Sequence, residues 1–222
     1  MPVLHHMPLS PFCRKVRLTL GEKGLPVELK EVRVWERPGA FLRLNPAGKA
    51  PVLTLDDGVA IADSNAIVEF VEEMAPTPPL IGASPGERAE TRRLIAWFDD
   101  KFFHEVTTHL YGEKVYKRLS RGGAPDSGAL RAGRANLGPH LDYIAWLCDR
   151  RTWLAGDHFS LADIAAGAHI SVLDFLGDVN WDKHDGAKLW YQRIKSRPSF
   201  RPLLADRVTG FQPPPHYPNL DF

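Results

Sequence analysis

The feature that most constrains this sequence is a change of periodicity about one third of the way along the chain. Up to about residue 75, short strand-like runs alternate with helical ones, whereas the remainder has helical periodicity only. Residues 76–82 contain three prolines and one glycine, which break helices, so a linker is expected at residues 75–86. The sequence therefore predicts a mixed α/β domain, an all-helical domain and a proline-rich tail, at residues 1–80, 87–205 and 206–222.

Caps and turns divide the first domain into elements. The apolar run Val3 to Met7 predicts a strand, and the pair Ser10-Pro11 predicts a helix start, because serine caps free N–H groups and proline loses no hydrogen bond there. Apolar residues recur every four positions along this helix, while Arg14, Lys15 and Arg17 lie around its other sides. The alternating run Val27 to Val34 predicts a second strand.

A hairpin and a second helix complete this domain. The turn Asp56-Asp57-Gly58 separates two apolar runs, which is typical of a β-hairpin. The helix that follows starts at Asp63-Ser64 and has apolar residues spaced for one buried face. The expected order is strand, helix, strand, hairpin, helix.

The second domain contains at least four helical signals. Apolar residues from Leu94 to Leu110 line one long helix, and those from Leu137 to Cys148 line another. Ser160 and Asp163 have the spacing of a capping box and are interpreted as structural. A last helix is expected at about residues 187–196, before Pro198.

Composition excludes several classes of function. The chain has 28 Lys and Arg residues against 27 Asp and Glu, a net charge of +1, which argues against nucleic-acid binding by broad phosphate neutralisation and leaves only a local basic patch as the alternative. Only two cysteines, Cys13 and Cys148, are present, and the adjacent His5 and His6 would point to opposite faces of a strand, so no metal site is expected. No apolar stretch is long enough for membrane insertion and no signal peptide is evident, so a cytoplasmic location is expected.

Four motifs in order resemble the cytosolic glutathione transferase superfamily. They are Ser10-Pro11-Phe12-Cys13-Arg14-Lys15, Asn45-Pro46 through Ala50-Pro51-Val52-Leu53, Asp63-Ser64-Asn65-Ala66-Ile67 and Ser160-Leu161-Ala162-Asp163-Ile164. The resemblance implies a thioredoxin-like N-terminal domain and an all-helical C-terminal domain. It also implies a glutathione pocket between them and a homodimer.

Ser10 matches the position that holds a catalytic Ser, Cys or Tyr in that superfamily. A hydroxyl at a helix N-terminus suits stabilisation of the glutathione thiolate, which is the nucleophile. The same oxygen would serve equally as a helix cap, and the sequence does not separate the two roles. Cys13 in the first turn is a secondary catalytic candidate. The alternative interpretation is that it packs as a small buried apolar residue.

The other glutathione-binding positions follow from the resemblance. It implies a cis peptide bond at Pro51 that leaves the Ala50 backbone free to pair with the cysteinyl part of glutathione. It also implies that Asp63 and Ser64 bind the γ-glutamyl end, while capping is the structural alternative. Candidates for the wall of a second-substrate site are Trp35, His104, Thr108 and Tyr111.

The tail changes the ranking of functions. Three consecutive prolines stiffen it, and Asn219-Leu220-Asp221-Phe222 then presents apolar anchors with acidic groups. The alternative is a tail that packs back over the cleft. Together with Val34-Trp35-Glu36-Arg37 and Ser10-Pro11-Phe12-Cys13-Arg14-Lys15, the tail resembles the FzlA-type cell-division proteins. That resemblance implies a non-enzymatic scaffold that binds FtsZ filaments through Trp35 and residues 219–222. The alternative is an active glutathione transferase that uses Ser10.

Overall fold

In the computed structural model, which describes residues 1–222, the N-terminal third folds around one four-stranded sheet of order β2-β1-β3-β4. Its strands are β1 Val3–His6, β2 Glu28–Glu31, β3 Val52–Thr54 and β4 Ala60–Ala62. Strand β1 runs parallel to β2 and antiparallel to β3, and β3 runs antiparallel to β4. The predicted hairpin is confirmed, while the second strand is shorter than the alternating run suggested.

Helices cover both faces of this sheet. Helices α1 and α3 pack against each other, and Leu4 of β1 is fully buried in the core they share. On the other face, the His5 ring lies 6.0 Å from the ring of Phe41 in α2, so the two adjacent histidines do point to opposite faces. The helical segments of this half are α1 Pro11–Glu22, η1 Val34–Glu36, α2 Gly39–Leu44 and α3 Ser64–Met74.

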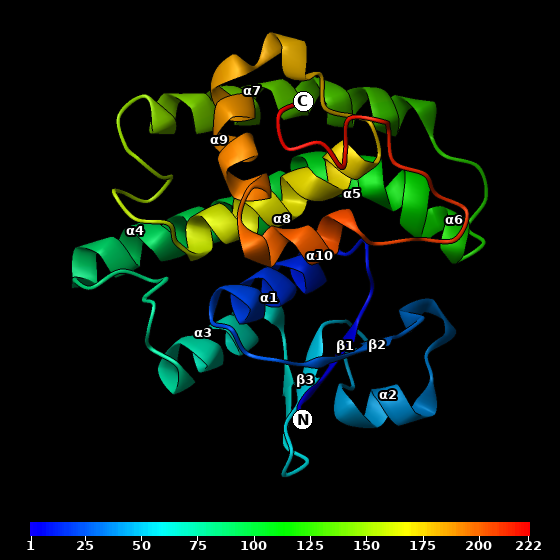
Figure 1. The fold of residues 1–222 in the computed structure, drawn as a ribbon. Coiled ribbons are helices and arrows are strands. Elements are labelled where there is room, and N and C mark those ends of the chain that lie inside the picture. Colours follow the sequence, from blue (N-terminus) through cyan, green and yellow to red (C-terminus); the bar gives the residue numbers. More distant parts are fainter.

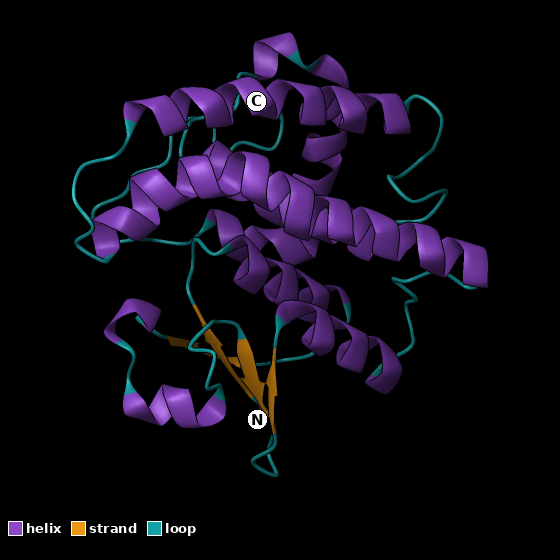
Figure 2. Cartoon of the chain, turned by 180° about the vertical axis from the view of Figure 1, so that it is seen from behind, coloured by secondary structure: helices purple, strands orange, loops and turns teal.

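The rest of the chain is helical, as predicted, and lies above the sheet in Figure 1. One long curved helix, continuous in Figure 2, runs from residue 85 to residue 119 and includes two stretches wound as π-helix. Its successive segments are α4 Pro85–Ala96, η2 Trp97–Thr107, α5 Thr108–Tyr111, η3 Gly112–Tyr116 and α6 Lys117–Leu119. The remaining segments are α7 Ser127–Cys148, α8 Leu161–Phe175, η4 Trp181–Lys183, α9 Asp185–Lys195, η5 Pro198–Phe200 and α10 Arg201–Leu204.

Helix α8 is the centre of the helical half, since every one of its residues is buried. The predicted capping box starts it: the Asp163 carboxylate accepts hydrogen bonds from the Ser160 backbone N–H at 3.1 Å and the Ser160 hydroxyl at 3.1 Å. The same carboxylate accepts from Leu154 N at 3.0 Å and Trp190 Nε1 at 3.0 Å. One buried side chain therefore joins the start of α8 to the preceding loop and to α9.

The two halves meet where α1 packs against α8. The charged residues of α1 are located at this junction: Arg14 and Lys15 are fully buried, and Arg17 forms a bidentate ion pair with Asp206 at 2.8 and 2.9 Å. Arg14 donates to Ser171 Oγ of α8 at 2.9 Å. These side chains thus connect the two halves rather than facing solvent.

The segment that follows α10 is ordered and returns to the helical half. In Figure 1 it runs around the outside of the helices and ends near α7 and α9. Tyr217 is fully buried, and its ring lies 5.2 Å from that of Phe175 at the end of α8. The tail therefore packs on the helices.

Candidate functional site

A cleft of about 750 Å³ lies between the sheet-containing half and the long helix. Seven of the residues singled out from the sequence line it: Ser10, Ala50, Pro51, Asp63, Ser64, His104 and Tyr111. They come from the start of α1, the start of β3, the start of α3 and the long helix. None of the lining residues comes from the tail, so the tail does not cover this cleft.

Ser10 is the cap of α1 and also borders the cleft. Its Oγ accepts a hydrogen bond from Cys13 N at 3.4 Å, a long distance for this interaction. The side chain is only 3% exposed, and the first turn of α1 directs its N–H groups toward the same end. The position therefore combines a hydroxyl donor with the positive end of a helix dipole, which would favour a thiolate placed there.

Cys13 is the weaker nucleophile candidate. Its side chain is fully buried, and its sulfur accepts a hydrogen bond from Met7 N at 3.4 Å. Burial raises the pKa of this thiol to about 11. A thiol of this kind stays protonated at neutral pH and packs as a small apolar group, so Ser10 is the better candidate for any chemistry.

The Ala50-Pro51 peptide bond is cis, as the resemblance implied. Pro51 is buried, whereas Ala50 lies at the edge of the cleft just before β3. Asn45 supports the preceding loop, since its Nδ2 donates to Lys49 O at 2.7 Å and its Oδ1 accepts from Ala47 N at 3.1 Å. A second cis bond, Thr77-Pro78, lies in the linker and was not foreseen.

The start of α3 places Asp63 and Ser64 at the cleft. Asp63 has a φ of 78°, which is unusual for a residue with a side chain and costs of order 1–3 kcal/mol. Its Oδ1 accepts from Asn65 N at 2.7 Å and from Ala66 N at 3.3 Å, so the carboxylate caps the helix. Asp63 lies in the cleft wall, and Ser64 is buried beside it.

A buried charged network that sequence reasoning missed reaches the cleft through Asn65 and Asp99. Lys15 Nζ donates to Asn65 Oδ1 at 2.7 Å and forms an ion pair with Asp99, while His169 Nε2 lies 3.4 Å from the other Asp99 oxygen. Burial alone would raise the pKa of Asp99, but the Lys15 charge and the contact with His169 outweigh it and lower that pKa. The adjacent acids Asp99-Asp100 were the only signal in the sequence.

The second-substrate candidates are only partly brought together. His104 and Tyr111 line the cleft, with Tyr111 largely buried and its pKa raised by that burial. Thr108 is exposed, does not line the cleft, and donates its hydroxyl to Phe103 O at 2.9 Å. Trp35 lies outside the cleft, but its ring packs edge-on against Tyr116, which does line it, with centroids 6.3 Å apart.

The four tail residues differ in their surroundings. Asn219 and Asp221 are exposed, while Leu220 and Phe222 are half-buried. The Phe222 ring packs on Trp181 with centroids 5.3 Å apart, and its carbonyl accepts from Gln192 Nε2 at 3.2 Å. Phe222 thus packs within its own chain, and of these four residues only Asn219 and Asp221 are exposed.

No group of three or more His, Cys, Asp or Glu side chains is arranged so that it could hold a metal ion. None of the helices has both the length and the apolar character needed to cross a membrane.

Comparison with known proteins gives matches along the whole chain. The profile of the glutathione S-transferase N-terminal domain matches residues 4–79, and that of the C-terminal domain matches residues 136–198. FtsZ-localized protein A of Caulobacter vibrioides (strain NA1000 / CB15N) is 53% identical over 222 residues, which cover 99% of this chain and 97% of that protein.

Two solved structures share the fold closely. That of a glutathione S-transferase from Rhodospirillum rubrum F11 has a TM-score of 0.98 at 53% identity, and the match covers 100% of both chains. That of FzlA from C. crescentus has a TM-score of 0.96 at 53% identity and covers 100% of this chain and 99% of the other. Proteins with two different names are therefore equally similar in sequence to this chain.

Proposed function

Because this chain belongs to the glutathione S-transferase family, with a thioredoxin-like N-terminal domain and a helical C-terminal domain, we propose that it works as an FzlA-like scaffold that binds FtsZ filaments in bacterial cell division. The observation that carries the proposal is its 53% identity to FtsZ-localized protein A over 99% of the chain. The proposed setting is the cytoplasm, without nucleic acid or membrane insertion.

The proposed partner surface lies at the edge of the cleft and on the tail. Trp35 is half-buried and packs on the exposed Tyr116, which gives a rigid aromatic pair of the kind that anchors protein interfaces. Asn219 and Asp221 are exposed on the docked tail. We also propose a homodimer, since two equivalent surfaces on one particle would allow it to bridge filaments.

Co-sedimentation with GTP-assembled FtsZ tests the scaffold. The wild-type protein should pellet with filaments, and Trp35→Ala and the double variant Asn219→Ala/Asp221→Ala should each pellet at least about threefold less, as expected for loss of an interface anchor. These point changes are preferable to truncation, because removing residues 215–222 would also remove the buried Tyr217.

The matched control is Trp146→Ala, which removes another partly exposed tryptophan, on α7. It should pellet like the wild type. If Trp35→Ala and the tail variant pellet as well as this control, the proposed interface is wrong. If the wild-type protein does not pellet at all, the scaffold function itself is wrong.

Light scattering tests the proposed homodimer. It should give twice the chain mass, and a monomer would contradict the dimer.

Glutathione binding is a second candidate, because the cleft retains the features that such a site requires. Ser10 lies at the positive end of α1, Pro51 follows a cis bond, and Asp63 and Ser64 stand at the start of α3. We propose that Ser10 would hold the thiolate, the Ala50 backbone the cysteinyl part, and Asp63 and Ser64 the γ-glutamyl end. Thiol conjugation or transfer is the activity this arrangement would support.

A melting-temperature shift on addition of glutathione tests binding separately from turnover. At a concentration 100 times the Kd, a ligand that binds only the folded state adds about 2.7 kcal/mol to stability. Ser64→Ala should reduce the shift, while Ser10→Ala should reduce turnover more than binding. Rapid glutathione-dependent turnover without FtsZ binding would favour the enzyme over the scaffold.

A further inference from the structure

The tail ends over a buried lysine. Lys195, the last residue of α9, is fully buried, and its Nζ donates no hydrogen bond to a protein atom. Instead this Nζ lies 4.0 Å from the ring centre of Phe222, 5.6 Å from that of Tyr191 and 5.8 Å from that of Tyr217. We call Lys195 and these three rings the lysine cage. Two of its rings belong to the tail.

A carboxylate completes the surroundings of Lys195. Asp174 Oδ2 lies 3.9 Å from Nζ, and Asp174 Oδ1 lies 2.9 Å from His216 Nε2 and accepts from Trp181 Nε1 at 2.9 Å. His216 in turn stacks on Phe222, with centroids 5.4 Å apart and planes at 29°. The tail thus contacts both members of the buried pair, Asp174 through His216 and Lys195 through Phe222.

The chemistry of a buried ammonium explains why these rings matter. Burial disfavours the charged form and lowers the pKa of Lys195 to about 8, which still leaves it mostly protonated at neutral pH. Without hydrogen bonds, the charge is stabilised by Asp174 and by the negative faces of the rings, and such contacts are stronger when water is excluded. Opening the tail would remove the nearest ring and expose Lys195 and Asp174.

We propose that Lys195 is the positioning residue that holds residues 216–222 against α8 and α9, so that a partner meets a fixed tail surface rather than a free peptide. Asn219 and Asp221 remain exposed on this surface, while Tyr217 is buried and Phe222 half-buried against the core. The role given to the partner rests on the proposed FtsZ binding, whereas the docking of the tail by Lys195 does not depend on it.

Amide hydrogen exchange of the tail tests the docking. The Asn219 amide donates to His216 O at 3.0 Å and the Tyr217 amide donates to Pro214 O at 3.0 Å, so both report opening of this segment. Lys195→Met preserves the apolar stem and removes the charge, and it should speed exchange at Asn219 about tenfold, the size expected for a desolvated cation–π contact. Tyr217 should change less, because its hydroxyl also accepts from Arg14 at 3.2 Å.

The matched control is Lys183→Met, which removes an exposed lysine of η4 and should leave exchange unchanged. Melting curves of all variants establish that each is folded. Phe222→Leu should also speed exchange at Asn219, and the double variant with Lys195→Met should show less than the product of the two effects, since both remove the same contact. If Lys195→Met exchanges like the control, or if the two effects multiply fully, packing alone holds the tail and the proposal is wrong.

Co-sedimentation with FtsZ then tests the consequence for the partner. Weaker pelleting of Lys195→Met, with Lys183→Met unchanged, would support a fixed tail surface. Faster tail exchange with unaltered pelleting would overturn the statement about the partner while leaving the docking intact. Failure of the wild-type protein to pellet would overturn the proposed function instead, and the exchange experiment would still decide whether Lys195 positions the tail.

Discussion

Replacing Arg14 by methionine should destabilise the fold by about 3 kcal/mol, because the guanidinium joins three distant parts of the chain. Its Nε donates to Pro8 O at 2.9 Å, and its Nη1 donates to Ser171 Oγ at 2.9 Å and to the Tyr217 hydroxyl at 3.2 Å. The side chain is fully buried, so water does not replace these bonds. Methionine retains an unbranched apolar stem and removes the charge.

The magnitude follows from two opposing contributions. Hydrogen bonds to a charged group are each worth about 1.5–3 kcal/mol, so three give a gross loss of roughly 4.5–9 kcal/mol. Removing the buried charge also removes its desolvation cost of several kcal/mol, which offsets part of this loss. Ser171 Oγ and the Tyr217 hydroxyl also keep bonds that they donate, to Ala168 O at 2.8 Å and to Leu203 O at 3.3 Å. The net value of about 3 kcal/mol lies below the gross range for these reasons.

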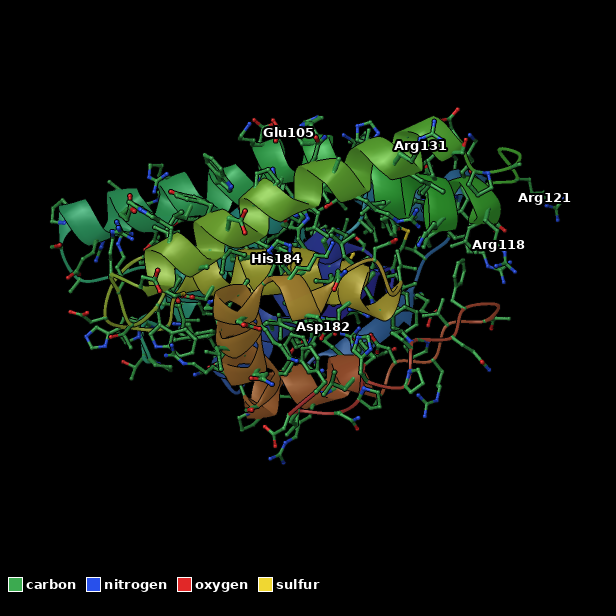
Figure 3. All side chains as sticks on the ribbon, turned by 90° about the horizontal axis from the view of Figure 1, so that it is seen from above. Glu105, Arg118, Arg121, Arg131, Asp182 and His184 are labelled. Carbon is green, nitrogen blue, oxygen red and sulfur yellow. The ribbon has the colours of Figure 1, made fainter.

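Calorimetry and urea denaturation measure this loss. For a chain of this size 1 kcal/mol corresponds to about 2–4 °C, so the melting temperature should fall by about 6–12 °C. Arg131→Met, an exposed change on α7 (Figure 3), is the control and should stay within about 0.5 kcal/mol of the wild type. A loss below about 1 kcal/mol for Arg14→Met would show that desolvation cancels the bonds, and would refute the reasoning.

Three further predictions concern single side chains. Native Cys13 should react with Ellman's reagent at pH 7 at least about tenfold more slowly than the chain unfolded in urea, because burial raises its pKa to about 11, and equal rates would contradict this. Burial, and then the Arg17 charge, lowers the pKa of His6 to about 4, so between pH 6.5 and 4 the unfolded state binds more protons than the folded state. The contribution of His6 to stability is therefore full above pH 6.5 and falls by about 2 kcal/mol from pH 7 to 5. In urea titrations, His6→Phe should remove this part of the pH dependence. Asp163→Ala should lower the free energy of unfolding by about 3–5 kcal/mol, since the N–H groups of Leu154, Ser160 and Trp190 lose their acceptor, and a change below about 1 kcal/mol would contradict the capping role.

Local structure was predictable where the responsible contact spans only a few residues. Ser10 bonds to Cys13 N, Asp63 to Asn65 N, and Asp163 to Ser160 N, so each cap is a property of three or four successive residues. The hairpin after β3 is determined in the same way by its turn. The resemblance added the cis bond at Pro51, which no local pattern distinguishes from a trans one.

The composition of the cleft was predictable only in part. The resemblance assigned Ser10, Asp63 and Ser64 to the cleft, and all three line it at helix starts, where free N–H groups are presented. Asp99 and Tyr116 were missed, since on a long helix charged and aromatic residues are common and the sequence does not state which face a second domain covers. The unusual φ of Asp63 also depends on the surrounding structure, which holds a conformation that an isolated residue avoids.

The sequence by itself determined the strands, the longer helices with their caps and the family resemblance, because these depend on periodicity and on contacts between near neighbours. It did not predict the short helix α2 between β2 and β3, where a loop was expected. Only the tertiary structure decided which charges are buried. Lys15 meets Asp99 across 84 positions and Arg14 meets Tyr217 across 203, and helical spacing placed both cations away from the apolar face. The same holds for the tail, whose prolines indicated a stiff segment. Whether it projects or docks depends on the energy of burying its aromatic rings against Lys195 and Asp174, and that energy exists only once α8 and α9 are packed.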